Sequence, residues 1–325
     1  MDAAAFDALV ASLRASRGIA AKADIGVVAE RLGLVGARVP VGDDCAAIPD
    51  GDGHLLFAIE GFMNEFVAAD PWFAGWCGVM VNLSDIAAMG GRPMAVVDAV
   101  WANGDVVARQ VLDGLSAAAR AYGVPIVGGH TNLRNPQQQL AVAILGRAGP
   151  RLLTSFDACP GDTLVIACDH RGRYREPFDN FQAALEAPPE RLRADLALLP
   201  ELAERGLARS AKDISQGGII GTALMLAESS GVSIDIDLDA IVPPPGVERA
   251  RWLRTFPSFG YLISVKPVDL DAVLTLFRER DLHAAAIGEV REGSQITVTA
   301  SGRRALIRDF ARERLMGLGL EAVVA

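Results

Sequence analysis

Hydrophobic positions in the first half of the chain alternate between helical and extended spacing. Apolar residues recur every three or four positions over Trp72–Met89 and Val106–Ala121, which predicts two helices. The first segment, Asp2 to Leu34, has the same spacing with a break near Gly18, so it is also expected to be helical. Short apolar runs between these helices predict strands at His54–Ile59, Pro93–Trp101, Pro125–Val127 and Gln139–Gly146.

The pattern begins again near Gly149, and the second half repeats the mixture. Predicted strands lie at Thr163–Ala167, Val232–Leu238, Phe259–Val265, Ala284–Val290 and Gln295–Thr299. Predicted helices lie at Arg191–Arg205, Ile219–Ser229 and Asp269–Arg280. Because each half contains both kinds of element, we predict an α/β (α+β) fold class with two domains, residues 1–148 and 149–325.

Composition narrows the classes of partner and the compartment. The 325 residues carry a net charge of −9, which argues against a basic surface for nucleic acid. No apolar run is long enough to span a membrane, and the acidic N-terminus is unlike a secretory signal. The four cysteines show neither a CxxC pair nor zinc-like spacing, and are expected to be buried thiols. We therefore expect a cytoplasmic protein with no nucleic-acid and no membrane partner.

Two acidic features occur in the first 90 residues. An extended stretch, Arg38–Val41, leads into a tight Gly42 turn followed by Asp43 and Asp44. Adjacent carboxylates repel each other, so they are stable either in water, as in a solvated turn, or on a hard cation. Asp85 lies inside an apolar helix and needs a partner, which is either a metal ion or an internal hydrogen bond or ion pair.

Two glycine-rich turns are candidate anion sites. Gly128, Gly129 and His130 follow a predicted strand, and paired glycines let backbone amides approach a phosphate, although a lone histidine is more often structural. The segment Asp213–Gly218 leads into a helix, whose free amides attract anions; ordinary N-capping by its polar residues is the alternative.

The inventory of these turns favours magnesium and phosphate chemistry. The chain has no GxxxxGK[ST] and no GxGxxG motif, which excludes a Walker or a Rossmann site. Carboxylates at glycine turns suit Mg²⁺, which binds one or two of them and leaves room for phosphate oxygens. Lysines are scarce, so each is a candidate for a specific role: Lys22, Lys212 and Lys266.

In their order and spacing, these features resemble one ATP-dependent superfamily. It includes aminoimidazole ribonucleotide (AIR) synthetase, thiamine monophosphate kinase, selenophosphate synthetase and a hydrogenase maturation factor. The resemblance covers nearly the whole chain, on the following segments: Gly42–Ala46, Asn82–Gly90, Gly128–Thr131, Pro160–Asp162, Asp213–Ser215 and Ile287–Val290. It implies a two-domain AIR synthase-like fold, with an N-terminal sheet domain that forms a dimeric barrel and a C-terminal α/β domain.

The resemblance also implies roles for single residues, with ATP and Mg²⁺ as cofactors at the dimer interface. The metal-binding carboxylates would be Asp43, Asp44, Asp85 and Asp213. The nucleotide would be contacted by Gly129, His130 and Ser215, with Glu60 as a substitute ligand. Lys22 and His130 are the candidate catalytic residues.

The nearest subgroup is thiamine monophosphate kinase, on the segment NLSDIAAMG at 82–90 and on Ala227–Val232. The kinase pattern places acids at His130 and Gln216 and before Tyr261, and all of these are absent. The segment Gly18–Lys22 resembles selenophosphate synthetase instead, but it lacks the reactive cysteine.

We therefore expect a Mg²⁺-dependent ATP-binding enzyme that transfers or hydrolyses the γ-phosphate to activate a small-molecule oxygen acceptor. The alternatives are a selenophosphate-synthetase-like or cyclo-ligase-like activity, or a non-catalytic nucleotide-binding relative. The first-half strands are apolar on both faces, which one domain of this size cannot easily cover, so a homodimer is also expected.

Overall fold

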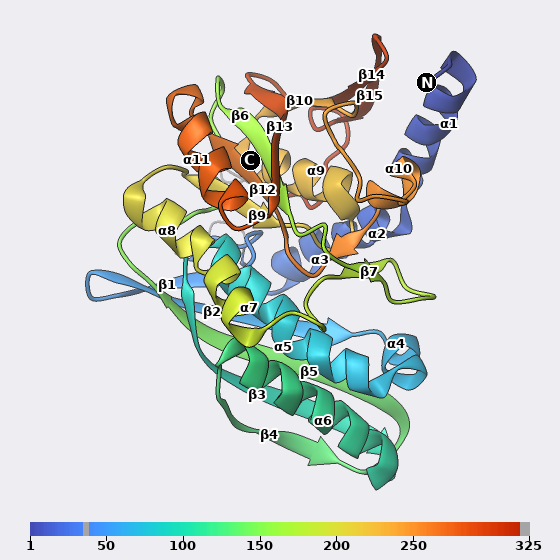
Figure 1. Cartoon of the computed structure of the whole chain (residues 1–325), viewed down its shortest axis with the longest axis vertical. Helices are drawn as coiled ribbons and strands as arrows, with labels where there is room; N and C mark the ends of the chain where they lie inside the picture. The colour runs from blue at the N-terminus through green and yellow to red at the C-terminus, as the bar shows by residue number, and fades with distance from the viewer. Residues whose placement is uncertain (35–38, 319–325) are drawn as a thin grey trace. The chain divides into compact units, whose positions relative to one another are not determined.

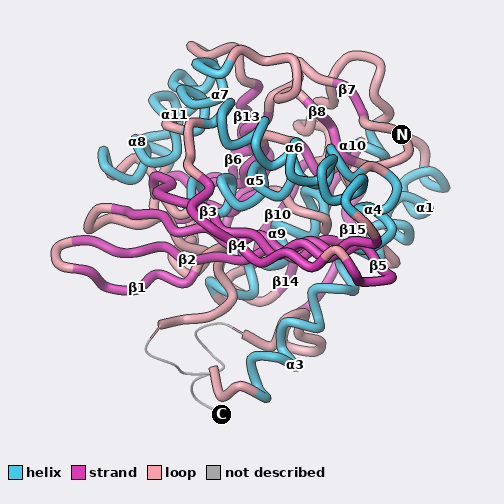
Figure 2. The backbone as a smooth tube through the Cα atoms, turned by 90° about the horizontal axis from the view of Figure 1, so that it is seen from below, coloured by secondary structure: helices cyan, strands magenta, loops and turns pink. Residues whose placement is uncertain are grey.

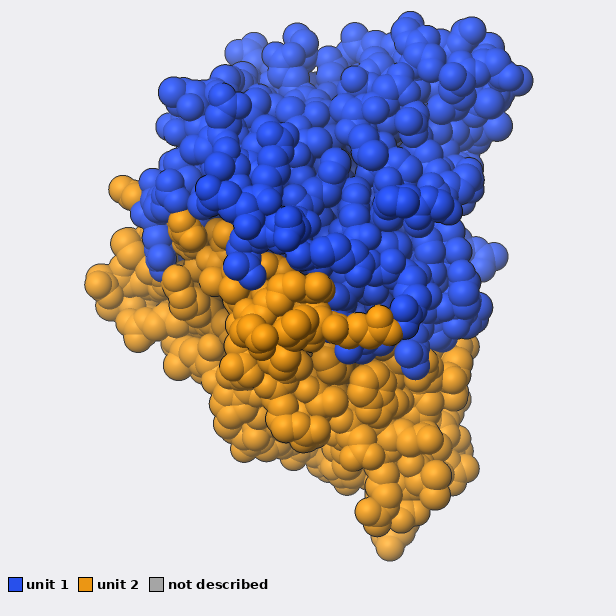
Figure 3. Space-filling model, viewed as in Figure 1, with its two compact units in different colours: residues 1–44, 152–185, 202–325 blue, residues 45–151, 186–201 orange. Residues whose placement is uncertain are grey.

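The computed structural model describes residues 1–34 and 39–318, which form two compact units (Figure 3). Unit 1 comprises residues 1–44, 152–185 and 202–325, and unit 2 comprises residues 45–151 and 186–201. Both units mix helices with strands, so the predicted α/β class is confirmed (Figure 1). Within the described ranges, no helix combines the length and the hydropathy that crossing a bilayer requires.

Unit 2 is a five-stranded sheet with its long helices on one side (Figure 2). The strand order is β1-β2-β5-β3-β4, and β3 and β4 are the parallel pair. The strands are β1 (Ala46–Asp50), β2 (Gly53–Phe62), β3 (Arg92–Asn103), β4 (Ile126–Asn132) and β5 (Arg134–Ala148). The helices are α4 (Asn64–Ala69), α5 (Pro71–Ala88), α6 (Asp105–Tyr122) and α7 (Pro189–Leu196); α8 (Leu198–Arg205) begins in unit 2 and ends in unit 1.

Helices α5 and α6 pack closely because each has a glycine at the contact. A methyl group on Gly75 would lie 2.0 Å from the carbonyl oxygen of Val111, and one on Gly114 would lie 1.9 Å from that of Trp72. These distances are far below van der Waals contact, so no larger residue fits without moving a helix. The close pair holds α5 rigidly on the sheet.

The opposite face of the unit 2 sheet is apolar and exposed. Phe57, Ile59 and Val127 have half or more of their surface exposed. Ile59 on β2 and Val97 on β3 lie in one row across β5, since both pair with Ala143. Such a face on a sheet is typical of an interaction surface.

Unit 1 contains a seven-stranded sheet in the order β15-β14-β10-β13-β6-β12-β9, and a small sheet, β11-β8-β7. Its strands are β6 (Thr163–Cys168), β7 (Arg173–Tyr174), β8 (Asn180–Gln182), β9 (Ser210–Asp213), β10 (Ser233–Asp237), β11 (Phe256–Pro257), β12 (Gly260–Val265), β13 (His283–Arg291), β14 (Gln295–Ala300) and β15 (Arg303–Asp309). Its helical segments are α1 (Ala3–Arg14), α2 (Arg17–Ala20), η1 (Ala21–Ala23), α3 (Asp24–Arg31), α9 (Gly218–Ser230), α10 (Arg249–Trp252), η2 (Pro267–Asp269) and α11 (Leu270–Arg278).

The first 44 residues cluster with the second half of the chain. Phe6 and Leu13 of α1 and Ile19 of α2 are buried in the same core as α9, every residue of which is buried. Apolar burial therefore ties the N-terminal helices to unit 1. The division of the sequence into domains 1–148 and 149–325 stays a prediction.

One predicted turn and one predicted extended segment were wrong. The turn at Gly128–Thr131 is part of strand β4, which pairs with β3 in parallel register. The pairing of successive backbone groups with β3 outweighs the weak strand propensity of two glycines. Val39–Val41 does not form a strand, and Arg38 lies outside the described residues. The remaining predicted helices and strands are confirmed within a few residues, with Arg191–Arg205 divided into α7 and α8.

Candidate functional site

The acidic cluster of unit 1 forms around Asp44, at the edge strand of the large sheet. Strand β9 is the last strand in the sheet order, so one edge of its backbone has no neighbouring strand. The backbone N–H of Asp213 donates to Asp44 Oδ2 over 3.3 Å, and Lys212 Nζ donates to Asp44 Oδ1. A carboxylate from a distant turn thus satisfies the open edge of β9.

Asp43 is held beside Asp44 by a serine that is remote in sequence. Ser155 donates its backbone N–H to Asp43 Oδ2 over 2.9 Å and its hydroxyl to Asp43 Oδ1 over 2.6 Å. Ser155 is itself fixed by Ser230 at the end of α9, whose hydroxyl donates to the Ser155 carbonyl. Burial and the neighbouring charge of Asp44 raise the pKa of Asp43 to about 6.

Lys212 is the cation of this cluster. The side chains of Lys212 and Asp44 are only 5% and 4% exposed. Burial works to lower the pKa of Lys212, but the charges of Asp44, Asp43 and Asp213 outweigh it and hold the pKa above its ordinary value. The lysine is therefore charged, and its charge is balanced by carboxylates.

The segment after Asp213 turns into α9 with one hydrogen-bonding group left over. Ile214 N donates to Gly260 O, and Gly218 N donates to Ser215 O, which fixes the turn. The hydroxyl oxygen of Ser215 is buried and has no hydrogen-bond partner among the described residues. A buried hydroxyl without a partner is costly, which indicates a place for a ligand or an ordered water.

Lys22 is carried by a segment that packs directly on this turn. A methyl group on Gly18 would lie 2.1 Å from the carbonyl oxygen of Gln216, and Ile19 packs on Gly221 of α9. Lys22 itself lies on η1 and is partly exposed. The structure thus brings the Gly18–Lys22 segment to the Ser215 turn, although the two are about 200 residues apart in the chain.

Asp85, the fourth predicted metal ligand, lies in unit 2 on α5 and is 6% exposed. Nearby polar groups satisfy the helix itself, since Asn82 donates its amide to the Gly78 carbonyl over 2.8 Å. Cys45, the residue after Asp44, donates its N–H to the Met89 sulfur at the end of the same helix. Both partners of this contact belong to unit 2.

Glu60 and Gly129 lie in one row of the unit 2 sheet. Val142 on β5 pairs with Glu60 on one side and with Asp98 on the other, and Asp98 in turn pairs with Gly129. A methyl group on Gly129 would lie 2.8 Å from the Asp98 carboxylate, and burial raises the pKa of Asp98. The row therefore has an acid at β2, an acid at β3 and a bare backbone at β4.

His130 belongs to the next row, on the opposite, exposed face of the sheet. It pairs with Ala99, and its ring lies 5.9 Å from that of Trp101. In a strand, successive side chains point to opposite faces, so Gly129 and His130 do not share a surface of unit 2.

Of the predicted residues, the structure brings together Asp43, Asp44, Asp213 and Ser215 in unit 1, and Glu60 with Gly129 in unit 2. Three partners were missed: Ser155, Lys212 and Asp98. The scarcity of lysines was a signal for Lys212 that was followed only for Lys22. For Ser155 and Asp98 no local signal exists, because their partners lie far away in the sequence.

Comparison with known proteins agrees with this architecture. The family model for the N-terminal domain of AIR synthase related proteins matches residues 42–148, and the model for the C-terminal domain matches residues 170–301. The protein sll0787 of Synechocystis sp. is 45% identical over 315 residues, which cover 95% of this chain and 97% of that protein.

Two solved structures share the fold. T. maritima PurL complexed with ATP aligns with a TM-score of 0.69 at 20% identity, over 81% of this chain; the chain spans only 45% of that larger protein. AaThiL complexed with AMPPCP and TMP aligns with a TM-score of 0.62 at 20% identity, over 86% of this chain and 94% of that one. With both domain models matched in order and a relative aligned over almost its full length, the chain belongs to the AIR synthase-related family.

Proposed function

We propose that this protein binds ATP with Mg²⁺ and transfers or hydrolyses its terminal phosphate to activate a small-molecule oxygen acceptor. The observation that carries the proposal is the buried cluster of Asp43, Asp44 and Asp213. It occurs in a family in which PurL has been solved with ATP. No dedicated protein nucleophile is needed, because the acceptor oxygen itself attacks the γ-phosphorus.

The residues of the cluster fit a magnesium ion. Carboxylate oxygens are the ligands that Mg²⁺ prefers, and three carboxylates around one ammonium leave a net charge of about −2. The Ser215 hydroxyl beside them has no partner among the described residues and can accept or donate to a bound group. Bound Mg²⁺ would neutralise the charge that phosphates carry. The chain's own residues would hold the ion and orient the nucleotide on the Ser215 turn.

We propose the unit 2 residues as the remaining part of the site on the strength of the sequence resemblance. Asp85 would be a further metal ligand, and Glu60, Gly129 and His130 would contact the nucleotide. Asp85→Asn keeps the shape of the side chain and removes its charge. It should weaken ATP·Mg²⁺ binding at least tenfold and leave thermal stability unchanged or raised. A loss of stability with normal nucleotide affinity would instead assign Asp85 to a structural role.

The acceptor is proposed to be most like that of a thiamine monophosphate kinase. AaThiL, which was solved with TMP, supports this choice, and the absent acids at His130, Gln216 and before Tyr261 weigh against a simple copy. A selenophosphate-synthetase-like reaction is supported by the packing of Gly18–Lys22 on the Ser215 turn, but not by its chemistry, since the segment has no cysteine. A cyclo-ligase-like reaction is the further alternative.

A non-catalytic nucleotide binder is the second candidate function. His130 and Gln216, where the kinase pattern has acids, are both exposed and uncharged or weakly basic. Phosphate release measured across thiamine monophosphate, formylglycinamidine ribonucleotide, a carbamoylated peptide and selenide separates the two candidates. Turnover stimulated by one of these compounds identifies an enzyme, whereas nucleotide affinity without any stimulated turnover identifies a binder.

We also propose a homodimer that forms through the exposed face of the unit 2 sheet. Phe57, Ile59 and Val127 would be covered by a second copy. Ile59→Glu should give monomers in light scattering at micromolar concentration. Val268→Glu, which alters a highly exposed apolar residue of unit 1, is the matched control and should leave the mass unchanged. A wild-type monomer would contradict the proposal. A cytoplasmic location remains our prediction and is consistent with four free cysteines.

Isothermal titration calorimetry with ATP tests the central proposal. The wild-type protein should release heat on binding ATP in the presence of Mg²⁺, and excess EDTA should abolish it. Circular dichroism of the same sample shows that the protein is folded. A folded wild-type protein that shows no heat of binding with ATP and Mg²⁺ rules out the proposal.

A further inference from the structure

Lys212 occupies a position where a lysine is rarely stable. All four residues of β9 are buried, and Lys212 is 4% exposed overall. An ammonium group loses its hydration on burial, which is costly unless carboxylates compensate. The neighbouring strand residue, Leu262, pairs with Lys212 and offers no polar side chain. The compensation therefore comes from the acidic cluster.

The contacts of Asp44 show how the compensation works. One of its carboxylate oxygens accepts from the Lys212 ammonium, and the other accepts from the Asp213 backbone N–H. Asp43 is turned toward Ser155, which donates to both of its oxygens. Lys212 thus sits against Asp44 in the position that a bound cation would otherwise take.

The charges give this arrangement a definite consequence. Asp43, Asp44 and Asp213 all act on Lys212 electrostatically, and together the four groups carry about −2 when ionised. One divalent ion balances that charge. Without the lysine the same three carboxylates would carry −3, which favours tighter binding or a second ion.

We propose that Lys212 is a built-in cation of the magnesium site, which takes the place of one divalent ion at Asp44 and lowers the number of ions that the cluster takes up. This inference rests on the proposed function. It also accounts for how a cluster can persist with Gln216, an exposed and uncharged residue, at a position where the kinase pattern has an acid.

The test counts Mn²⁺ ions by electron paramagnetic resonance, with no nucleotide present. Lys212→Met keeps the length of the side chain and removes its charge. We expect it to bind Mn²⁺ at least tenfold more tightly than the wild type, or to bind one ion more. We also expect its Tm to fall in EDTA and to rise with Mn²⁺ by more than that of the wild type. Unchanged Mn²⁺ affinity and number would overturn the inference.

Two controls isolate the charge of Lys212. Lys266→Met removes an exposed lysine of the same unit and should leave Mn²⁺ binding unchanged. Lys212→Arg keeps the charge and should bind Mn²⁺ like the wild type. Should Lys212→Met fail to fold, the same comparison is made in the absence of the ion pair. The double variant Asp44→Asn/Lys212→Met should bind Mn²⁺ more tightly than Asp44→Asn alone, and equal binding would overturn the inference.

The result is separable from the proposed function. Wild-type ATP binding with unchanged Mn²⁺ binding in Lys212→Met would remove only the role of Lys212. Tighter Mn²⁺ binding in the variant, with no ATP binding by the wild type, would support the built-in cation and overturn the nucleotide proposal.

Discussion

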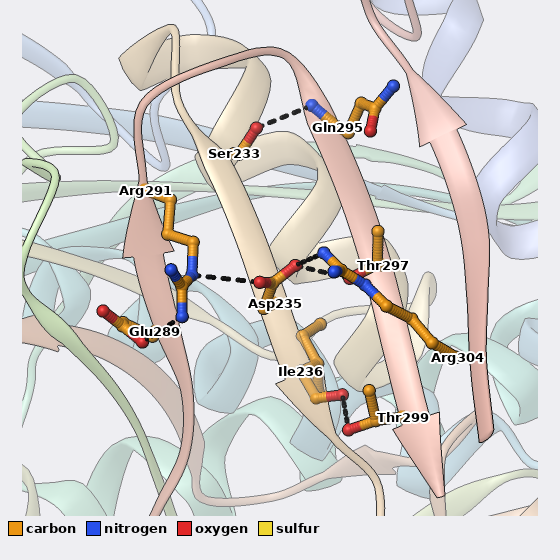
Figure 4. A network of polar contacts seen from close by, with 9 residues as sticks. All are labelled: Ser233, Asp235, Ile236, Glu289, Arg291, Gln295, Thr297, Thr299 and Arg304. Atoms are coloured by element: carbon orange, nitrogen blue, oxygen red, sulfur yellow. Dashed lines mark hydrogen bonds and ion pairs between the residues drawn. The ribbon is translucent and has the colours of Figure 1, made fainter. Parts of the chain in front are cut away.

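Unit 1 contains two clusters in which an aspartate meets basic side chains, and they differ in exposure. Around Asp235, Arg291 and Arg304 approach from neighbouring strands at 3.0 and 2.6 Å, with their side chains 55% and 60% exposed (Figure 4). Around Asp44, Lys212 is almost completely buried. Water screens the first cluster, so its ion pairs contribute little to stability, whereas the second cannot lose one partner without leaving a buried charge.

The difference teaches where function is to be sought. An exposed network such as that of Asp235 is common on sheet surfaces, and its parts compensate one another and water. A buried cluster with three acids and one base has an excess of one sign, which solvent does not neutralise. Such an excess is maintained only if it serves a ligand or is offset by the rest of the fold.

The largest expected effect is that of Asp44→Asn. The variant leaves Lys212 buried without its hydrogen-bonded carboxylate, so the free energy of unfolding should fall by about 3–5 kcal/mol. ATP·Mg²⁺ binding should be lost as well. Urea unfolding and calorimetry measure both. A loss of stability below about 1 kcal/mol would mean that the two clusters do not differ as we infer.

A smaller loss is expected when Asp43 loses a donor. Ser155→Ala removes the hydroxyl and keeps the backbone N–H, and a hydrogen bond to a charged group is worth about 1.5–3 kcal/mol. Ser294→Ala, which removes a hydroxyl donor to Asp309, is the matched control and should cost less. Equal losses in urea unfolding would contradict the special position of Asp43.

Asp43 should also make stability depend on pH. Its pKa is raised from 3.8 to about 6, so between these values the folded protein keeps a proton that the unfolded chain releases. The corresponding stability is fully present below about pH 4 and is lost as pH rises through 6. Asp43→Asn has no proton to lose. Measured in EDTA from pH 4 to 7.5, the stability of Asp43→Asn relative to the wild type should therefore increase with pH; a constant difference would refute the shift.

The smallest effect is expected for the exposed cluster. Asp235→Asn should lower the free energy of unfolding by about 0.2–1 kcal/mol, because both arginines remain hydrated. The loss should shrink further in 1 M salt, where charges are screened within about 3 Å. Calorimetric melting at low and high salt checks this, and a loss as large as that of Asp44→Asn would erase the distinction between the clusters.

Much of the fold could be predicted from hydrophobic spacing. The helix predicted at Trp72–Met89 is observed as α5, Pro71–Ala88, because a long apolar period has one stable solution. Gly128–Thr131 could not be assigned in the same way. Its strand conformation depends on pairing with β3, a tertiary contact that overrides local propensity.

The candidate site was predictable only in part, for a related reason. Asp43, Asp44 and Asp213 stand at turns that mark themselves by glycine and charge. Lys212 stands in the apolar strand Ser210–Asp213 and gives no local sign of its partner. Its role is defined by a carboxylate 168 residues earlier, and such pairings are visible only after the chain has folded.

The separation of Asp44 from Lys212 also has a consequence during protein synthesis. Ribosomes add roughly 5–20 residues per second, so about 8–34 s pass between the two residues. Throughout that interval the nascent chain carries Asp43 and Asp44 without their lysine and without Ser230, which fixes Ser155. The cluster is therefore among the last features of unit 1 that can form, and a chain that stops before Lys212 has no means of assembling it.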